Sequence, residues 1–499
     1  MTQAAAPATP RLPHADGNEL ALLFVAGEWR ESASRRRIEI RDPASGDLVG
    51  EAALGAREDA RAALEAAQAT FRAWADTTAK ERAEVMHRAA SLLRHRIWEI
   101  ARVLTLEQGK PLADAHKEIA FSADVIAYYA DEALRLGGEW RPASGPKIRS
   151  LVLRQPVGVV VAIVPWNYPI DLLSWKLAPA LAVGCTVVAK PATGTPLATA
   201  RVIRCFEDAG VPPGVVNFVI GPGGEVGDEL VENPISRAIK ITGSTATGRR
   251  VMQLASGHIK RLTLELGGHT PLIVLDDADL DAVVPAAVRR SYSNMGQICI
   301  SVNRVFVAGR IESDFLSAFA EQARRLRLGH GLDPGVEYGP LFDEGTRERT
   351  SRHVHDALVR GARVVIGGRV PPGADYESGW FYEPTLIADA APEMLVMQEE
   401  TFGPVAAVSR IASDAEAIEL ANATPYGLAA YVFGRDLERC LRIAERLEVG
   451  GVGVNVNDVT EVQAPFGGWK ESGLGRELGP EGLAACLEPK HIRIGLGGA

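Results

Sequence analysis

Hydrophobic and polar positions along the chain follow a helical period first and a strand-like pattern afterwards. Residues 57–76, 80–108 and 112–136 carry long helical patterns rich in Ala, Leu, Glu and Arg. Residues 23–29 alternate enough to predict one early strand. Short continuous apolar runs then predict strands that are buried on both faces of a parallel sheet. These runs occupy residues 157–164, 185–190, 215–220, 237–242, 262–266 and 271–275.

Helical segments lie between these strand-like runs. They occupy residues 171–182, 196–209, 224–232 and 245–255. Strand and helix in alternation predict a doubly wound α/β domain. A second alternating set begins near residue 279 and runs to about 465, which predicts a second α/β domain. The segments 147–155 and 491–496 alternate with polar residues, and we expect both to belong to one sheet that projects from the body.

Length and charge indicate a multidomain protein and argue against the nucleic-acid-binding and membrane-spanning classes. With 499 residues the chain exceeds the size of a single core, so two or three domains are expected. A net charge of −9 gives no sign of the excess positive charge with which proteins bind nucleic acid or anionic lipid. The charge-free run between Lys176 and Lys190 is too short to span a bilayer. Residues 1–19 lack the apolar core of a signal peptide and are expected to form a disordered leader.

The cysteines are an odd and scattered set, namely Cys185, Cys205, Cys299, Cys440 and Cys486. Their spacing fits neither a disulfide framework nor a zinc site. We therefore expect no metal and a reducing, cytoplasmic setting.

One cysteine lies in a segment suited to chemistry. SNMGQICIS, residues 293–301, places Cys299 among small and amide side chains just before a predicted strand. Glycine beside a reactive centre lets backbone N–H groups approach a ligand closely. Free cysteines are, however, usually buried and inert, so this segment alone leaves both interpretations open.

A carboxylate and an amide occupy the ends of two predicted buried strands. Glu265 ends one apolar run, at the edge where open α/β sheets bind ligands. It could serve as a base that activates water, or it could pair with an arginine. Asn167, in the turn PWNYP, could donate to an oxyanion together with the backbone N–H of Cys299, or it could be an ordinary turn asparagine.

Seven motifs together give the chain a recognisable pattern. PWNYP, GCTVVAKPA, ITGSTATG, LELGG, GQIC, EETFGPV and PFGGWKESGLGRE occur in the order and approximate spacing of the aldehyde dehydrogenase superfamily. The chain resembles this family from about residue 20 to its C-terminus. The interval of 34 residues from Glu265 to Cys299 matches the family's spacing of base and nucleophile. The resemblance implies the family's fold, with a Rossmann-like cofactor domain, a second α/β catalytic domain and a projecting oligomerisation arm.

The resemblance also implies a reaction, the NAD(P)-dependent oxidation of an aldehyde to a carboxylate. Cys299 would attack the carbonyl as a thiolate and form a thiohemiacetal. Asn167 and a backbone amide would hold the oxyanion while hydride leaves to the nicotinamide. Water activated by Glu265 would then cleave the thioester. A branch of the family that transfers the acyl group to coenzyme A lacks this base, so Glu265 favours hydrolysis.

The cofactor contacts that the resemblance implies do not use a GxGxxG loop. They fall on Trp166, Lys190, Gly223, Gly227, Gly243, Ser244, Glu400 and Phe402. Lys190 would contact the adenine ribose, whereas Trp166 and Ser244 would contact the pyrophosphate, at a helix N-terminus that favours anions. Glu400 and Phe402 would hold the nicotinamide ribose and ring.

One departure from the family bears on the choice of cofactor. Many members that prefer NAD carry a glutamate three residues after this lysine, where the chain has Thr193. Without that carboxylate a 2′-phosphate is not repelled, and a hydroxyl beside Lys190 could bind it. We therefore expect NADP to be accepted, alone or beside NAD.

Substrate charge separates the nearby groups of the family. Succinate-semialdehyde enzymes are expected to clamp the distal carboxylate with two arginines, and the matching positions are Trp175 and Ser293. Tyr168, Trp175 and Phe466 indicate an aromatic tunnel instead, unless these rings only pack the core. We expect an uncharged or aromatic aldehyde, with succinate semialdehyde and betaine aldehyde as alternatives.

The resemblance also bears on one charged pair, on the domain boundaries and on the oligomeric state. Lys176 and Glu477 match a proton relay of some members, or form a structural ion pair. The expected cofactor domain spans 20–136 and 156–266, the catalytic domain 267–465, and the oligomerisation arm 137–155 and 480–499. That arm predicts a dimer or a tetramer. Two other classes stay open: a protein that keeps the fold without turnover, and a hydrolase that uses the thiol without cofactor.

Overall fold

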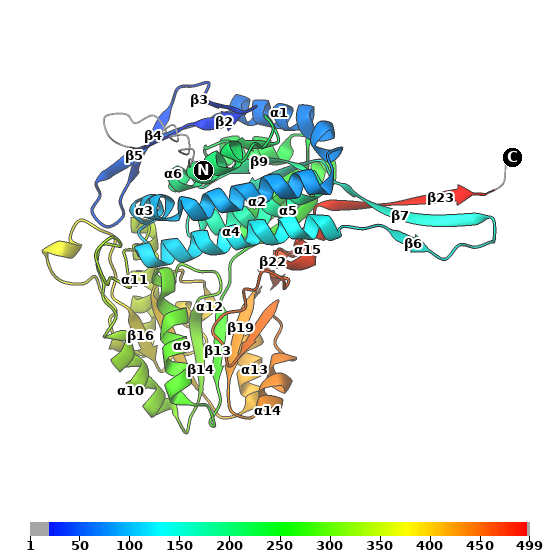
Figure 1. Cartoon of the computed structure of the whole chain (residues 1–499). Helices are drawn as coiled ribbons and strands as arrows, with labels where there is room; N and C mark the ends of the chain where they lie inside the picture. Colours follow the sequence, from blue (N-terminus) through cyan, green and yellow to red (C-terminus); the bar gives the residue numbers. More distant parts are fainter. Residues whose placement is uncertain (1–18, 497–499) are drawn as a thin grey trace, which may run out of the picture.

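A computed structural model describes residues 19–496 of the chain. The leader expected at 1–19 lies outside the described residues except for Glu19. Two α/β bodies, each with its own hydrophobic core, adjoin one another, and a narrow strand arm projects from the first (Figure 1). No helix among residues 19–496 has both the length and the apolar character needed to cross a membrane.

The first body is built on a mostly parallel sheet of eight strands. In spatial order these are β22 (Gly473–Leu474), β12 (Arg261–Glu265), β11 (Ser236–Thr242), β8 (Val159–Ile163), β9 (Thr186–Lys190), β10 (Val216–Phe218), β2 (Leu23–Val25) and β3 (Glu28–Arg30). The β-branched runs form the central strands, and β9 is buried along its whole length. The single strand expected at 23–29 is instead two strands, because Ala26 and Gly27 both have positive φ and form a turn.

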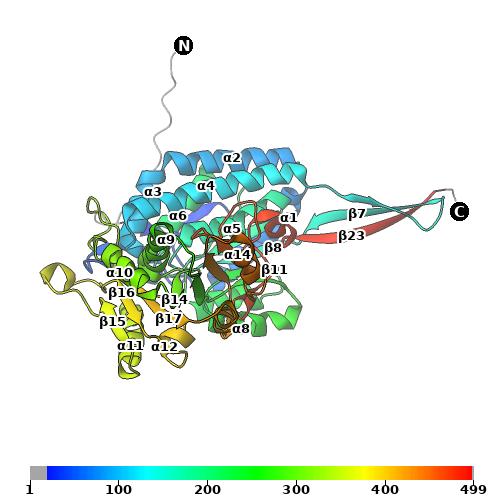
Figure 2. The ribbon, with the colours of Figure 1, turned by 90° about the horizontal axis from the view of Figure 1, so that it is seen from below.

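Helices cover this sheet, with α2 and α4 lying side by side (Figures 1 and 2). They are α1 (Arg57–Ala75), α2 (Ala79–His95), α3 (Ile97–Gln108), α4 (Leu112–Arg135), α5 (Pro169–Val183), α6 (Pro196–Asp208), α7 (Asp228–Glu232), α8 (Thr245–Ala255) and α15 (Gly479–Ala484). Thr78 begins α2 with a capping box, in which its hydroxyl accepts from Glu81 N–H at 3.2 Å.

Two helical expectations need correction. The pattern over 80–108 is two helices, α2 and α3, which meet at Arg96 (φ −97°, ψ 11°). The Arg96 guanidinium pairs with Asp208 at 2.6 Å, which fixes this break against the end of α6. The segment 224–232 begins with a π-helical turn, η1 (Gly223–Gly227), before α7.

The second body holds a seven-stranded sheet, parallel except for β15. Its strands in spatial order are β15 (Arg363–Ile366), β16 (Thr385–Ala388), β17 (Val405–Ile411), β14 (Val302–Ala308), β13 (Thr270–Val274), β19 (Ala429–Phe433) and β20 (Gly451–Val454). The run at 271–275 therefore belongs to this sheet, and the second set begins before residue 279. Its helices are α9 (Leu280–Tyr292), α10 (Glu312–Ala323), α11 (Glu344–Val359), α12 (Leu395–Gln398), α13 (Asp414–Asn422) and α14 (Leu437–Ala444).

Smaller sheets complete the chain. β1 (Glu19–Ala21), β5 (Leu48–Ala53) and β4 (Arg37–Arg41) form one, and β18 (Tyr426–Gly427) pairs with β21 (Trp469–Lys470). The arm consists of β23 (Leu487–Gly495), β7 (Ile148–Pro156) and β6 (Glu139–Arg141), all antiparallel. The two arm segments far apart in sequence do pair, although the second strand begins at Leu487 and not at 491 (Figure 1).

The chain brings its candidate residues to the junction of the two bodies. Asn167 follows β8, and Glu265 is the last residue of β12, so both lie at the carboxyl edge of the first sheet. Cys299 lies just before β14 of the second sheet. The C-terminal strand β22 pairs with β12, which brings residues 465–477 against the same edge.

Candidate active site

The segment that carries Cys299 has an unusual backbone. Asn294, Met295 and Gly296 follow one another with φ of 47°, 57° and 71°. Left-handed conformations at successive residues persist only where the surroundings hold them, and they often mark functional loops. Gly268, in the segment between β12 and β13, approaches so closely that a Cβ there would lie 2.0 Å from the Cys299 carbonyl oxygen. The backbone of the half-buried Cys299 is therefore packed against the segment that connects the two bodies.

Asn167 is anchored by buried polar groups. Its side-chain N–H₂ donates to the Gln297 carbonyl at 2.9 Å, and its own carbonyl accepts from Lys110 Nζ at 2.7 Å. Lys110 pairs with Glu118, and both side chains are fully buried. Because an amide nitrogen carries two protons, one N–H of Asn167 can still donate to a ligand oxygen.

Glu265 is isolated at the end of its strand. It is 3% exposed, and neither carboxyl oxygen has a hydrogen-bond partner among residues 19–496. Burial raises the pKa of Glu265 well above its usual range, and Glu477 raises it further, whereas Lys176 and Arg476 oppose the shift. The carboxyl group therefore holds its proton more tightly than an exposed glutamate does.

Lys176 and Glu477 form a fully buried ion pair, with Nζ and Oε2 2.9 Å apart. Lys176 Nζ also donates to Thr242 Oγ1 at 2.7 Å. Thr242 and Glu265 line the same cavity, so the pair lies behind the cavity wall near Glu265. The geometry fits a relay and equally fits a structural pair, and the relay stays a prediction.

One cavity of about 300 Å³ unites the catalytic candidates Cys299, Glu265 and Asn167 with the three aromatic candidates. Those aromatic side chains are Tyr168, Trp175 and Phe466. The Trp175 and Phe466 rings meet edge to face, with centroids 5.0 Å apart. Trp175 Nε1 donates to Asp171 Oδ1 at 2.9 Å, which fixes the indole in the wall. These rings thus pack against each other and also line the cavity.

The environment of Cys299 keeps its thiol protonated at rest. Burial raises the pKa of Cys299 to about 12, and Glu400 and Glu265 raise it further, while Arg290 lowers it. Since thiolate is the nucleophile, reaction at neutral pH requires a group that takes the proton.

The adenine-side candidates include a buried cation without a counter-charge. Lys190 is 6% exposed, no carboxylate among residues 19–496 pairs with it, and its Nζ donates only to the Pro191 carbonyl at 3.3 Å. Burial lowers the pKa of Lys190 to about 8. A Cβ on Gly227 would lie 3.7 Å from the Lys190 Cε, so the two residues adjoin. An uncompensated cation of this kind fits a ligand rich in hydroxyl or phosphate oxygens.

Trp166, expected at the pyrophosphate, contacts Phe402, which is expected at the nicotinamide. Trp166 stacks on Phe342 with centroids 4.3 Å apart and meets Phe402 edge to face at 5.6 Å. Glu400 accepts from the Gly268 backbone N–H at 3.0 Å, and burial raises its pKa to about 7. The same Gly268 lies against the Cys299 carbonyl, so Gly268 contacts both Glu400 and the residue that carries the thiol.

Four cofactor candidates are more loosely placed. Ser244 Oγ accepts from Thr247 N–H at 3.2 Å and caps α8, and Gly243 N–H donates to the Glu265 carbonyl at 3.0 Å. Thr193 is half-buried in the turn between β9 and α6, whereas Gly223 is exposed at the start of η1. Neither Thr193 nor Gly223 lines the cavity that holds Cys299.

Sequence reasoning missed several charged residues in the cavity wall, among them Arg290, Asp458 and Asp171. Arg290 and Asp458 form an ion pair across 168 residues of sequence, so no local motif could reveal it. Asp171 is the only acid in the apolar helix α5, which is a signal that could have drawn attention. Ser293 also lines the cavity, but its hydroxyl donates to the Arg289 carbonyl at 2.7 Å.

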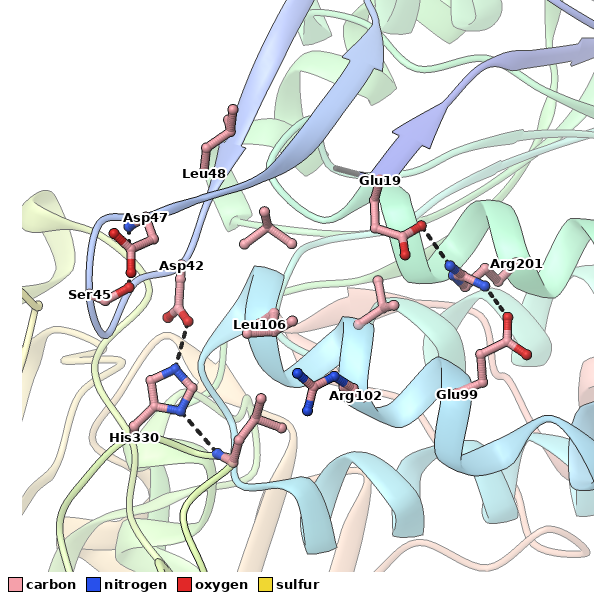
Figure 3. Close-up of a pocket in the computed structure, with 13 residues that line it drawn as sticks. Glu19, Asp42, Ser45, Asp47, Leu48, Glu99, Arg102, Leu106, Arg201 and His330 are labelled. Atoms are coloured by element: carbon pink, nitrogen blue, oxygen red, sulfur yellow. Dashed lines mark hydrogen bonds and ion pairs between the residues drawn. The ribbon is translucent and has the colours of Figure 1, made fainter. Parts of the chain in front are cut away.

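A second, larger cavity of about 560 Å³ lies elsewhere, between β4, β5, α3 and α6 (Figure 3). His330 pairs with Asp42 at 2.7 Å, and Arg201 pairs with Glu19 at 2.6 Å. Figure 3 draws both contacts as dashed lines. None of the candidate residues lines it. Most of its charges are paired within the wall, and the reactive groups gather in the smaller cavity. Residues 19–496 contain no group of three or more His, Cys, Asp or Glu side chains suited to a metal ion.

Comparisons with known proteins agree on one family. A family model described as "Aldehyde dehydrogenase family" matches residues 29–492. The chain is 42% identical over 473 residues to the succinate-semialdehyde dehydrogenase [NADP(+)] of Escherichia coli (strain K12), covering 95% of this chain and 97% of that protein. It is 40% identical over 472 residues to the betaine aldehyde dehydrogenase of Bacillus subtilis (strain 168), covering 94% and 96%. The structure matches betaine aldehyde dehydrogenase from Staphylococcus aureus in complex with NAD+, with a TM-score of 0.94 at 36% identity, covering 96% and 95% of the two chains.

Proposed function

The chain belongs to the aldehyde dehydrogenase family, and from this premise we propose that it oxidises an aldehyde to the carboxylic acid through a thiohemiacetal on Cys299. The observation that carries the proposal is the shared cavity, in which Cys299, Glu265 and Asn167 converge from both bodies. Their types supply a nucleophile, a base and an oxyanion donor, which the reaction requires. Convergence of this kind disfavours a protein that keeps the fold without turnover.

We assign the steps as follows. Cys299 Sγ gives its proton to Glu265 or to a water and bonds to the carbonyl carbon, while the free N–H of Asn167 and the Cys299 backbone N–H hold the oxygen. Bound nicotinamide would accept the hydride that leaves the same carbon. Glu265 then takes a proton from water, whose oxygen attacks the thioester and releases the acid. Lys176 and Glu477 would carry that proton away from Glu265.

The cofactor would be held by Lys190 and Gly227 on the adenine side, by Trp166 and Ser244 at the pyrophosphate, and by Glu400 and Phe402 at the nicotinamide ribose and ring. Support comes from the unpaired cation of Lys190 and from the exposed N-terminus of α8. We propose that NADP is accepted because Thr193 brings no negative charge. Among relatives, the E. coli enzyme carries NADP(+) in its name and the S. aureus enzyme was solved with NAD+.

We propose an uncharged or aromatic aldehyde as the substrate. Trp175 and Ser293 supply no cation, and Arg290 already has a carboxylate partner. The relatives' names span semialdehydes and betaine aldehyde at similar identity, so they do not select among these substrates.

The proposal also assigns regions to roles. The cofactor would bind the body formed by 20–136 and 156–266, catalysis would use 267–465, and assembly into a dimer or tetramer would use 137–155 and 480–499. A reducing, cytoplasmic setting is supported by the five cysteines, all of which are free.

The test is formation of reduced cofactor across an aldehyde panel, with NAD and NADP in parallel. We expect neutral and aromatic aldehydes to be oxidised efficiently, and Cys299→Ala to be silent. Ester cleavage without any oxidation would point to the hydrolase alternative, and silence of the wild type to a non-catalytic protein. A best efficiency for succinate semialdehyde would overturn the substrate proposal. Preference for NAD by more than about a hundredfold would overturn the cofactor proposal.

A further inference from the structure

A buried arginine in the wall of the active-site cavity has its charge neutralised by an exposed aspartate. Arg290 belongs to α9 and is 8% exposed, and its Nη2 pairs with Asp458 Oδ2. Asp458 lies on the loop that follows β20, and its side chain is 53% exposed. Both residues line the cavity that holds Cys299. The pair thus links a buried cation in the cavity wall to a carboxylate that is exposed to solvent.

Arg290 is rigidly placed with respect to the reactive cysteine. Ser301 Oγ, two residues beyond Cys299, donates to the Arg290 carbonyl at 3.0 Å. The Arg290 guanidinium also donates through Nε to the Asn457 carbonyl. Its positive charge reaches the reacting region, since it opposes the rise in the pKa of Cys299 and of Tyr168.

Asp458 is held in the position from which it pairs with Arg290. Its second oxygen, Oδ1, accepts from the Thr460 backbone N–H at 2.9 Å, and Thr460 lines the cavity too. A free guanidinium binds a carboxylate with two parallel hydrogen bonds, which is the usual means of gripping an acidic substrate. Asp458 takes that place within the protein, and its negative charge repels a second carboxylate.

The other charges of the wall do not replace this function. Glu118 pairs with Lys110, and Asp114 pairs with Lys117 at 2.8 Å. Arg289 has no ion-pair partner among residues 19–496, but it is exposed, so solvent screens its charge. Arg290 is therefore the buried cation that could bind the second carboxylate of an acidic aldehyde. Asp458 already pairs with it.

We propose that Asp458 determines specificity by masking Arg290 against aldehydes that carry a second carboxylate. This inference rests on the proposed function and deepens it, because it names the pair of side chains that excludes semialdehydes. Removal of the Asp458 charge should raise the activity toward succinate semialdehyde without any new cation being introduced.

The test compares kcat/KM for succinate semialdehyde with kcat/KM for butanal in each variant. Asp458→Asn keeps the shape of the side chain and removes its charge, so the ratio should rise at least about tenfold, as one charge-assisted hydrogen bond allows. Asp458→Ser must give a rise in the same direction. Glu461→Gln is the matched control, because it removes one exposed carboxylate from the same loop, and it should leave the ratio unchanged.

A double variant assigns the gain to the arginine. Asp458→Asn combined with Arg290→Met should return the ratio to the wild-type value. A ratio that stays within about twofold of the wild type in Asp458→Asn overturns the inference. A gain that survives in the double variant also overturns it, because another group would then bind the carboxylate. Failure of the proposed function looks different, since the wild type would oxidise neither aldehyde.

Discussion

At the scale of single residues, burial in the cavity raises the pKa of both reacting groups, the Cys299 thiol and the Glu265 carboxyl group. Burial raises the pKa of Cys299 to about 12 and that of Glu265 well above its usual range. The thiol cannot ionise readily by itself, and the base is unavailable until it has lost its own proton. Catalysis should therefore depend on pH in a range set by the cavity and not by the usual carboxyl pKa.

We predict that Glu265→Gln removes the rise of turnover with pH. In the wild type the carboxylate form is the base, so the rate should increase with pH as Glu265 loses its proton above the usual carboxyl range. In the variant, the first turnover should still yield reduced cofactor, followed by a steady rate lower by about a hundredfold or more. Rapid-mixing and steady-state measurements across pH check this.

Glu461→Gln serves as the control, since it removes an exposed carboxylate outside the cavity wall. Wild-type turnover with an unchanged pH profile in Glu265→Gln would assign the base to another group.

Single-sequence reasoning reached these residues because each lies in a local motif. Glu265 ends an apolar run and Cys299 lies three residues after Gly296, so both are visible within a few positions. The Arg290–Asp458 pair is invisible in this way, because its partners meet only when α9 and the loop after β20 pack together. The isolation of Glu265 from any partner also depends on packing and could not be read from the chain.

At the scale of elements, a buried ion pair joins the C-terminal segment to α5. Lys176 of α5 and Glu477 are both fully buried, with Nζ and Oε2 2.9 Å apart. Removal of one partner leaves a buried charge without compensation, which typically costs about 3–5 kcal/mol. The pair should therefore hold residues 465–477 over the cavity.

We predict that Lys176→Met and Glu477→Gln each lower the free energy of unfolding by roughly 3 kcal/mol, and that the double variant loses much less than the sum. Denaturant titration of all four proteins measures the coupling. The exposed pair Arg249–Glu471, 2.6 Å apart, is the matched control, and Arg249→Met should cost less than about 1 kcal/mol. Additive losses would show that the two side chains act independently.

Elements with a clear period were predictable, and those that depend on packing were not. The strands at 157–164 and 185–190 and the helices at 57–76 and 112–136 agree with β8, β9, α1 and α4 within a few residues. The apolar pattern cannot show which of two sheets a buried strand joins, which is why the run at 271–275 is grouped with the first set of strands although it forms β13 of the second sheet. The break at Arg96 depends on its pairing with Asp208, a contact distant in sequence.

At the scale of the whole molecule, the arm presents an apolar face that the described chain leaves uncovered. Trp140 of β6, Leu151 of β7 and Ile492 of β23 are paired in register, so they lie in one row across the sheet. Trp140 is 65% exposed and Ile492 is 37% exposed. Apolar rows with free strand edges are usually covered by a partner, which supports the proposed dimer or tetramer.

We predict that Trp140→Arg combined with Ile492→Arg converts the oligomer to a monomer, because two charges would have to be buried at the interface. Light scattering during size-exclusion chromatography measures the mass. Val359→Arg, at a 72% exposed position on α11, should leave the assembly intact. An unchanged mass for the arm variant would place the interface elsewhere.

The return of the C-terminal segment to the first sheet bears on how the protein is made. β22 pairs with β12, and Gly467 lies so close that a Cβ there would be 2.8 Å from Glu265 Oε1. A nascent chain can fold its early helices while the ribosome is still adding residues, but Glu265 stays open to water until residues 465–477 have emerged. Contacts so distant in sequence close late. A growing chain therefore acquires its enclosed reaction chamber only at the end of synthesis.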